Sequence, residues 1–286
     1  MREKKQYKRF TRSKAGNVIV FTGLILMGLF AVLPLAYSVI TSFKPLEELM
    51  IFPPRFFVVR PTLQNYTELP NIISSLSVPL SRYDFNSFFV SILTTTLHII
   101  VASMAAFVLS KGKFKGLVFI FWLVQFSLLY TAYTLEIPRY LIYSKLSMID
   151  TYWIYILPYL PSTMGVFLIK QYMDGSVPDA LIEAAHIDGA NDLQIYWKII
   201  MPIVKPAWMT LCLFSFRDLW SLQPSGTIFT EELKMLPNVM STIVNGGIAR
   251  SGSAMATTVL LMIPPIVVYL VSQSNVMETM SSAGIK

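Results

Sequence analysis

Two adjacent charged residues, Arg217 and Asp218, lie inside the otherwise apolar segment 207–222. At the centre of a membrane-spanning helix each charge costs about 2.5–3.5 kcal/mol on insertion scales, so both side chains should face a cavity, a partner or each other. Neighbouring residues on a helix point in directions about 100° apart, which disfavours a direct pair between them. The guanidinium group of Arg217 can donate paired hydrogen bonds to hydroxyl or carboxylate groups.

Two interpretations of these charges stay open. In the first, Arg217 and Asp218 line a path for a polar solute beside Trp220 and Gln223, and the indole of Trp220 stacks on an apolar face of that solute. In the second, the span ends earlier, and both charges lie at the outer interface or pair with a partner protein.

Polar and aromatic side chains on segment 117–137 are weaker candidates for the same path. They are Trp122, Gln125, Tyr130, Tyr133 and Glu136. Because Trp and Tyr near span ends usually form interfacial belts, a belt is the simpler interpretation, with Gln125 and Tyr133 kept as candidates for the path.

Sequence patterns for catalysis or metal binding are missing. His98 and His186 lie far apart with no cysteine or acidic cluster near either, and Cys212 has no second cysteine to pair with. No nucleophile elbow or H-E-x-x-H is present, and Gly112-Lys113 lacks the spacing of a phosphate-binding loop. We therefore expect no catalytic residue, metal or cofactor on this chain, and we expect His98 to be a hydrogen-bonding partner between spans.

Membrane-spanning helices must position these residues. Apolar residues make up 54% of the 286 positions and charged residues 14%, against about a quarter in soluble domains. The apolar residues form blocks of about 20, the length that crosses about 30 Å of hydrocarbon as a helix. Six spans are predicted, at roughly 17–40, 87–109, 117–137, 151–170, 207–222 and 254–273. The predicted fold class is an all-α membrane protein with one domain, 1–286.

Two of these spans have unusual composition. The second is rich in hydroxyl groups and contains His98, so it should face protein or a cavity rather than lipid. The fourth holds Pro158 and Pro161, which should kink or break it. The external segment 41–86 is proline-rich and predicts a small cap, not a catalytic domain.

The distribution of Lys and Arg predicts the orientation. Seven cations lie in the basic arm 1–16, before a first apolar block too long for a cleavable signal peptide. With the N-terminus inside, the cytoplasmic segments hold 14 Lys and Arg and the external segments hold eight, so both termini are predicted to be cytoplasmic. The arm also accounts for the net charge of +7, which indicates contact with anionic lipid rather than nucleic acid.

The segment 171–206 differs from every other predicted loop because its residues favour helices. Ser176, with Asp179 three residues later, predicts a capping box before a helix over 179–188. Gly189 should end that helix, and Asn191 with Gln194 should begin a second one. The sequence thus predicts a cytoplasmic helix–turn–helix that pivots at Gly189. The alternative is an amphipathic loop that only connects two spans.

The stretch EAAHIDGANDLQIYWKIIMPIVKP, 183–206, resembles the EAA loop of permease subunits of binding-protein-dependent ABC importers. Glu183-Ala184-Ala185, Gly189, Ile199 and Pro202 occupy the spacing of that pattern, with Met201 where Leu is usual. Ser42-Phe43-Lys44, Asn65-Tyr66 and the tail 282–286 are similar to the maltose-type carbohydrate permease family.

The resemblance implies a six-span permease in the bacterial inner membrane, working by alternating access. Its partners would be a second permease, two ATP-binding subunits that hold ATP and Mg²⁺, and an external solute-binding protein. It assigns the coupling to the ATPase to Glu183, Ala184, Ala185, Asp188 and Gly189. Small alanines allow close helix approach, and a carboxylate suits a basic partner. The expected cargo is an oligosaccharide or a modified or acidic sugar.

Other functions remain open at this point. The chain could import another polar solute, such as an amino acid or a peptide. It could also be a membrane sensor or assembly subunit that keeps the ATPase contact and moves nothing. An ion channel is disfavoured, because neither repeated filter sequences nor rings of like charge occur in the sequence.

Overall fold

The computed structural model describes residues 14–74, 78–129, 135–223, 226–244, 247 and 250–283, and within these ranges the regular structure is entirely helical. The helices before the central loop are α1 (Lys14–Ser42), α2 (Leu46–Leu49), α3 (Gln64–Thr67), α4 (Leu69–Ser74), α5 (Leu80–Lys111), α6 (Leu117–Ser127), α7 (Glu136–Lys145), α8 (Trp153–Ile156), the 3₁₀ turn η2 (Leu157–Tyr159) and α9 (Thr163–Ser176). They are followed by α10 (Asp179–Ile187), α11 (Asp192–Ile195), the π-helical η3 (Tyr196–Ile200), α12 (Met201–Ile203), α13 (Lys205–Trp220), η4 (Glu231–Leu233), α14 (Leu236–Val244) and α15 (Ser251–Ala283).

Three helices are long and apolar enough to cross a membrane: α1, α5 and α15. A bent pair, Asp192–Ile203 with Lys205–Trp220, passes the same test as one span broken by 79°. By length and composition the described residues therefore provide three or four spans, and the count of six remains a prediction. The third predicted span is the least complete, because α6 ends at Ser127 and residues 130–134 lie outside the described ranges.

The fourth predicted span is broken, as its prolines predict. Pro158 lies in the 3₁₀ turn η2, and the chain becomes α-helical again only at Thr163, after Pro161. The hydroxyl of Ser162 accepts a hydrogen bond from the Gly165 N–H at 2.9 Å and so caps the new helix. Each proline removes a backbone donor and clashes with the preceding turn, so a continuous helix cannot form here.

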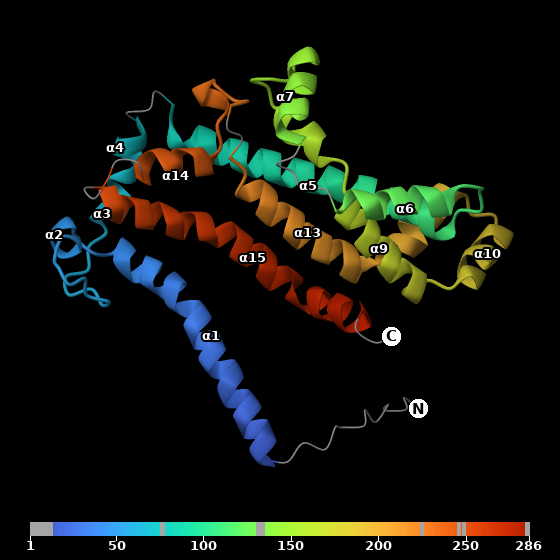
Figure 1. Cartoon of the computed structure of the whole chain (residues 1–286), viewed down its shortest axis with the longest axis horizontal. Helices are drawn as coiled ribbons and strands as arrows, with labels where there is room; N and C mark the ends of the chain where they lie inside the picture. Colours follow the sequence, from blue (N-terminus) through green and yellow to red (C-terminus); the bar gives the residue numbers. More distant parts are fainter. Residues whose placement is uncertain are drawn as a thin grey trace.

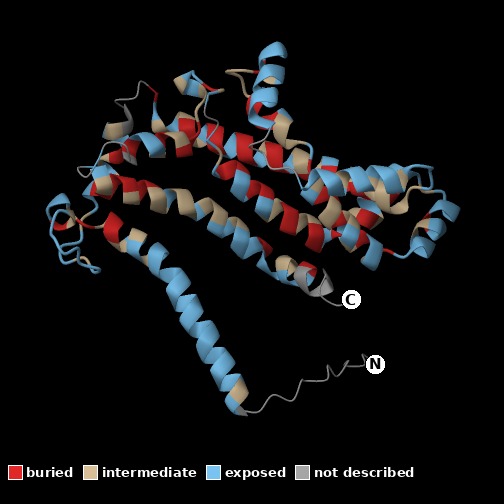
Figure 2. Ribbon diagram, viewed as in Figure 1, coloured by how far each residue is buried: buried red, intermediate tan, exposed pale blue. Residues whose placement is uncertain are grey.

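The helices α5, α9, α13 and α15 form the centre of the molecule, and α13 packs against the other three. Figure 2 shows buried residues along α5 and α13, whereas α1 is exposed over most of its length. Small residues allow close packing: a Cβ atom on Gly165 of α9 would lie 2.7 Å from Leu211 Cδ2 of α13. The core therefore forms where α9 and α13 approach each other.

The helix α1 joins this bundle through its C-terminal end. It approaches α15 near α2 and diverges from it toward Lys14 (Figure 1). The side-chain amide of Asn65 donates to the carbonyl oxygens of Ser42 and Lys44 at 2.8 Å each, and the hydroxyls of Ser42 and Tyr66 lie 2.8 Å apart. Two motifs that are 21 residues or more apart in sequence thus fix the end of α1 against the rest of the chain.

The two ends of the molecule differ. The short helices α2, α3, α4 and α14 gather at one end of the long axis, whereas α10 and the C-terminal end of α15 lie toward the other (Figure 1). This arrangement places the segment 171–206 on the same side as the C-terminus.

Candidate functional site

The loop 171–206 is helical, as predicted from its start and stop signals. The helix α10 ends at Ile187, and Gly189 takes a φ of +82°, which glycine adopts without the steric cost met by other residues. The Asn191 side chain accepts from the Gln194 N–H at 2.8 Å, and the Gln194 side chain accepts from the Asn191 N–H at 3.0 Å. This reciprocal capping box confirms the predicted start of the second helix.

The predicted cap at Ser176 is wrong. Ser176 is the last residue of α9, and its hydroxyl donates to the Tyr172 carbonyl oxygen at 2.7 Å. The N-cap of α10 is Pro178, whose side chain has no hydrogen-bond acceptor for the first N–H groups of the helix. Because α9 continues without a break into the loop, Ser176 lies at a helix C-terminus, where the carbonyl four residues earlier occupies its hydroxyl.

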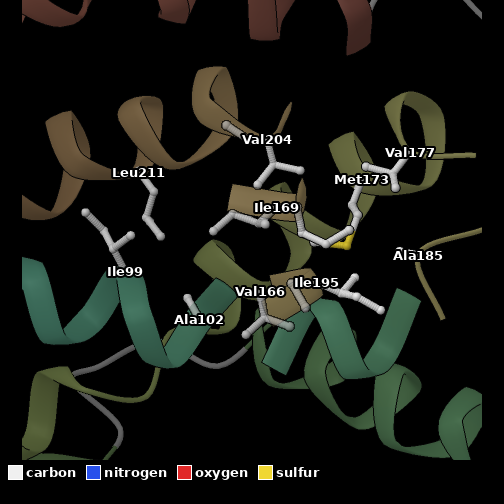
Figure 3. Close-up of a cluster of buried hydrophobic side chains, with 13 residues drawn as sticks. Ile99, Ala102, Val166, Ile169, Met173, Val177, Ala185, Ile195, Val204 and Leu211 are labelled. Atoms are coloured by element: carbon white, nitrogen blue, oxygen red, sulfur yellow. The ribbon is translucent and has the colours of Figure 1, made fainter. Parts of the chain in front are cut away.

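The residues assigned to ATPase coupling divide into two groups. Ala185 is 8% exposed and belongs to the same core as Ile169, Met173 and Ile195 (Figure 3). The other four are exposed: Glu183, Ala184, Asp188 and Gly189. The helix α10 is therefore attached to the bundle on one side and open on the other.

The open side of this loop carries apolar side chains, of which sequence reasoning singled out only Ala184. Leu181, Ala184 and Ile187 follow one another at intervals of three residues on α10, so they lie along one side of the helix. Ile187 is 86% exposed. Leu193 on α11 and Trp197 on η3 are also exposed, and they are four residues apart. We call these five residues the apolar loop surface; their helical spacing and their exposure are the signals that identify them.

Ionic and polar contacts connect the loop to the end of α5. The Lys111 Nζ atom lies 2.7 Å from Asp179 Oδ1 and also donates to the Val177 carbonyl oxygen at 2.7 Å. The hydrogen bond and the charge of Lys111 hold the pKa of Asp179 below its usual range. Deeper in the bundle, the hydroxyls of Ser103 and Tyr196 are 2.7 Å apart. A displacement of the loop would therefore act directly on α5.

Arg217 and Asp218 bind each other, against the expectation from their adjacent positions. The Arg217 Nε and Nη2 atoms lie 3.0 and 2.8 Å from Asp218 Oδ1. Both residues lie in the last turn of α13. The arginine side chain is long enough to reach across the angle between neighbouring positions. Both side chains are open to the surroundings, with 64% and 60% of their surface exposed.

Trp220 does not line a path in this structure. It is 3% exposed, and its Nε1 donates to the Leu261 carbonyl oxygen of α15 at 2.9 Å. The rings of Phe88 and Phe216 pack against it, with centroids at 4.9 and 5.7 Å. These contacts cover the indole, so Trp220 packs in the core and is not free to stack on a solute.

The other predicted path residues are not brought to this position. Gln125 is exposed on α6. The helix α6 packs on α5 and α9, but none of its residues is buried. Tyr133 lies outside the described residues. Gln223, which follows α13, is exposed.

A pocket next to Asp218, lined by both polar and apolar side chains, was not predicted. It has a volume of about 240 Å³ and lies between α5, η2, α9 and α13. Its polar lining consists of His98, Tyr159, Ser162, Thr163, Ser215 and Asp218, and its apolar lining includes Met164, Leu211, Phe214 and Leu219. The Nδ1 atom of His98 lies 2.6 Å from the Tyr159 carbonyl oxygen, which confirms His98 as a hydrogen-bonding partner between elements. The lining residues come from three separate stretches of the sequence, so no single motif predicts the pocket.

Metal-binding geometry is not found in the described part of the chain, where no three His, Cys, Asp or Glu side chains come together. The Cys212 thiol is free and partly buried.

No family model matches the chain. Among curated relatives, the polygalacturonan/rhamnogalacturonan transport system permease protein YtcP of Bacillus subtilis is 26% identical over 275 residues, covering 90% of this chain and 93% of that one. The galactooligosaccharides transport system permease protein GanQ of the same organism is 29% identical over 278 residues, covering 94% and 95%. Protein LplC of Bacillus subtilis is 30% identical over 220 residues, covering 73% and 69%.

Among solved structures, a bacterial ABC transporter involved in the import of the acidic polysaccharide alginate shares the fold. Its matching chain superposes with a TM-score of 0.74 at 22% identity, over 92% of this chain and 98% of that chain. Since the relatives named as transport permeases match nearly the full length, and LplC is 30% identical over more than two thirds of both chains, this protein belongs to the family of sugar-transport permease subunits of ABC importers.

Proposed function

We propose that this chain forms half of the membrane pore of an ATP-driven importer whose cargo is an oligosaccharide or a modified sugar. It would pair with a second permease, with two ATP-binding subunits that hold ATP and Mg²⁺, and with an external solute-binding protein. The names of YtcP and GanQ support a sugar cargo.

The observation that carries this proposal is the loop between α9 and α13. It presents the apolar loop surface on one side and is fastened to the bundle core through Ala185 and Ile195 on the other. Where a helix of a membrane protein faces water, an exposed apolar patch on it marks a site of contact with another protein. In our proposal, a groove of the ATP-binding subunit covers Ile187 and Trp197, and Glu183 and Asp188 face basic residues at its rim.

The packing around the loop supports a mechanical link to the pore. Ile195, Ile200 and Val204 are fully buried and belong to one cluster with Ile99, Ala102 and Leu211 of α5 and α13 (Figure 3). Close-packed interiors transmit displacement because they have little free volume. Movement of an ATP-binding subunit would therefore shift α10 and α11 and, with them, the inner ends of α5 and α13. Alternating access would follow from this displacement.

The orientation belongs to the same proposal. We place the chain in the bacterial inner membrane with the N-terminus, the C-terminus and the segment 171–206 in the cytoplasm. The excess of Lys and Arg in these segments supports this placement, as does the location of α10 at the same end as the C-terminus (Figure 1).

A second cargo class is favoured by one observation. The sn-glycerol-3-phosphate transport system permease protein UgpE of Yersinia enterocolitica is 28% identical over 205 residues, covering 70% of this chain and 73% of that one. A phosphorylated polyol is therefore the alternative cargo to test beside oligosaccharides.

The test uses the full complex in nanodiscs and measures ATPase activity stimulated by the solute-binding protein. Gly189→Val places a branched side chain at a φ of +82° within the coupling turn and should lower stimulation at least several-fold. Gly116→Val is the matched control, because Gly116 has a φ of +104°, lies in open space as Gly189 does, and precedes α6 outside the loop. Equal loss in both variants, or none in Gly189→Val, would contradict the coupling role.

A further inference from the structure

The pocket between α5, η2, α9 and α13 lies at membrane depth. His98 is about 20 Å of helix from Lys111 at the inner end of α5, by the 1.5 Å rise per residue. Asp218 lines the same pocket as His98, so the charged end of α13 is also located well inside the predicted spans. This depth favours the interpretation in which Arg217 and Asp218 face a path or a partner over the one that places them at the outer interface.

The opening of the pocket faces away from lipid. The side chains of Asp218, which lines the pocket, and of its neighbour Arg217 are both more than half exposed. Two charged groups cannot face hydrocarbon without a cost of several kcal/mol, even as a pair. The exposed side of α13 therefore faces the partner permease or the aqueous path between the two permeases.

The polar groups of the pocket suit hydroxyl groups. The Tyr159 carbonyl can only accept, so Nδ1 of His98 carries the proton and Nε2 is an acceptor. Arg217 binds Oδ1 of Asp218 and leaves Oδ2 without a partner among the described residues. On the donor side, the first N–H groups of α9, at Thr163 and Met164, have no acceptor within their helix. A hydroxyl group both donates and accepts, and so can satisfy either kind of partner.

The apolar walls complete this match. Leu211, Phe214 and Leu219 of α13, with Met164 of α9, supply the surface that the C–H face of a sugar ring requires. A uronate ring would instead bring its carboxylate toward Asp218, and like charges at close range repel each other. The charge of Arg217 is already paired with that of Asp218 through two of its five donors.

We propose that this pocket binds one ring of a neutral oligosaccharide, whose hydroxyl groups donate to Asp218 Oδ2 and His98 Nε2, and that it selects against uronate rings, so that the cargo differs from the polygalacturonan in the name of YtcP. The inference rests on the proposed function, since it names the class of cargo and the contacts that this permease makes with it.

The experiment measures uptake into proteoliposomes that contain the full importer, with a neutral galactooligosaccharide and an oligogalacturonate of the same length as probes. Wild type should take up the neutral probe at least tenfold faster. Asp218→Asn and His98→Asn should each lower uptake of the neutral probe about tenfold. His98→Asn keeps a donor for the Tyr159 carbonyl and removes the Nε2 acceptor, so it separates the pocket role from the structural one.

A third variant guards against misfolding. Met164 is exposed at the pocket, so Met164→Trp should fill the pocket and block uptake without disturbing the core, whereas Met104→Trp, at an exposed position on α5, should behave as wild type. Stimulated ATPase activity is recorded in parallel for wild type, and co-purification of the ATP-binding subunits should persist in every variant. Unchanged uptake in all three pocket variants, or faster uptake of the oligogalacturonate, overturns the pocket proposal alone. Absence of both uptake and stimulated ATPase in wild type overturns the proposed function and the pocket proposal with it.

Discussion

Gly252 at the start of α15 approaches Asn65 so closely that a Cβ atom at position 252 would lie 2.3 Å from Asn65 Oδ1. No real Cβ atom tolerates that distance, so the amide of Asn65 has space only because position 252 is glycine. The same amide holds the carbonyl oxygens of Ser42 and Lys44. One close approach thus fixes the junction between α1, α3 and α15.

Gly252→Ala should therefore release Asn65 from both carbonyl oxygens. With two hydrogen bonds worth about 1 kcal/mol each, we expect a loss of about 2 kcal/mol and a clear fall in the melting temperature of the detergent-solubilised protein. Gly175→Ala on α9 is the control, because nothing lies within 4 Å of its added Cβ atom. A melting temperature equal to that of wild type in Gly252→Ala would show that α1 is not fixed through Asn65.

The loop before α8 and the segment after α13 are joined by one carboxylate. Asp150 Oδ1 accepts from the N–H groups of Phe229 and Thr230 at 2.9 Å each, and the Thr230 hydroxyl donates to Oδ2. These hydrogen bonds hold the pKa of Asp150 below its usual range. The folded pKa is depressed, so this stabilisation is present above the unfolded value of about 3.9 and is lost as the pH falls through the lower folded value.

Asp150→Asn should accordingly lower the melting temperature at pH 7, and the difference from wild type should shrink as the pH falls below about 4. Thermal unfolding at several pH values measures this. Glu136→Gln changes an exposed carboxylate on α7 and should show no such convergence. A difference that stays constant down to pH 3 would mean that the charge of Asp150 contributes nothing to the contact.

Local signals predicted the parts of the fold whose cause is local. Gly189 and the Asn191–Gln194 capping box act within a few residues, and Pro158 and Pro161 break their own helix, so the sequence identified each of them. The predicted cap at Ser176 was wrong because α9 continues to Ser176, whose hydroxyl donates to the Tyr172 carbonyl oxygen. The function predicted for Arg217 and Asp218 stays a prediction, and their adjacent positions did not predict that the long arginine side chain reaches its neighbour.

The contacts that could not be predicted join segments far apart in sequence. Trp220 looked like a ligand for a solute because its neighbours are charged, yet Phe88 and Leu261 cover it. The pocket has the same origin, since His98, Ser162 and Asp218 meet only after α5, α9 and α13 have packed. Periodicity identifies a helix and its apolar face but does not specify which helices become neighbours.

The attachment of the loop to α5 offers a comparison between two lysines. The Lys111 side chain is 9% exposed and holds both Asp179 and the Val177 carbonyl, whereas Lys113 and Glu183 are mostly exposed and 3.5 Å apart. Exposed pairs of the second kind contribute about 0–1 kcal/mol. Lys111→Met should therefore lower stimulated ATPase several-fold, and Lys113→Met should change it less than twofold. The reverse order would place the link to the ATPase at Glu183 rather than at the base of α10.

Buried hydroxyls on α5 give the last prediction. Ser91, Thr94 and Thr95 are buried, and their hydroxyls have no hydrogen-bond partner among the described residues, although an unpaired polar group in a protein interior is costly. Thr94→Val keeps the shape of the side chain and removes the hydroxyl, so it should leave stability unchanged or raise it by about 1 kcal/mol.

Ser103→Ala, on the same helix, is the contrasting variant. Its hydroxyl lies 2.7 Å from that of Tyr196 and donates to the Ile99 carbonyl, so its removal should cost about 1–2 kcal/mol. Melting temperatures of the two variants, measured in the same detergent, compare a hydroxyl that has no partner among the described residues with one that has three. If Thr94→Val proves as destabilising as Ser103→Ala, the Thr94 hydroxyl must be hydrogen-bonded by water in the folded protein.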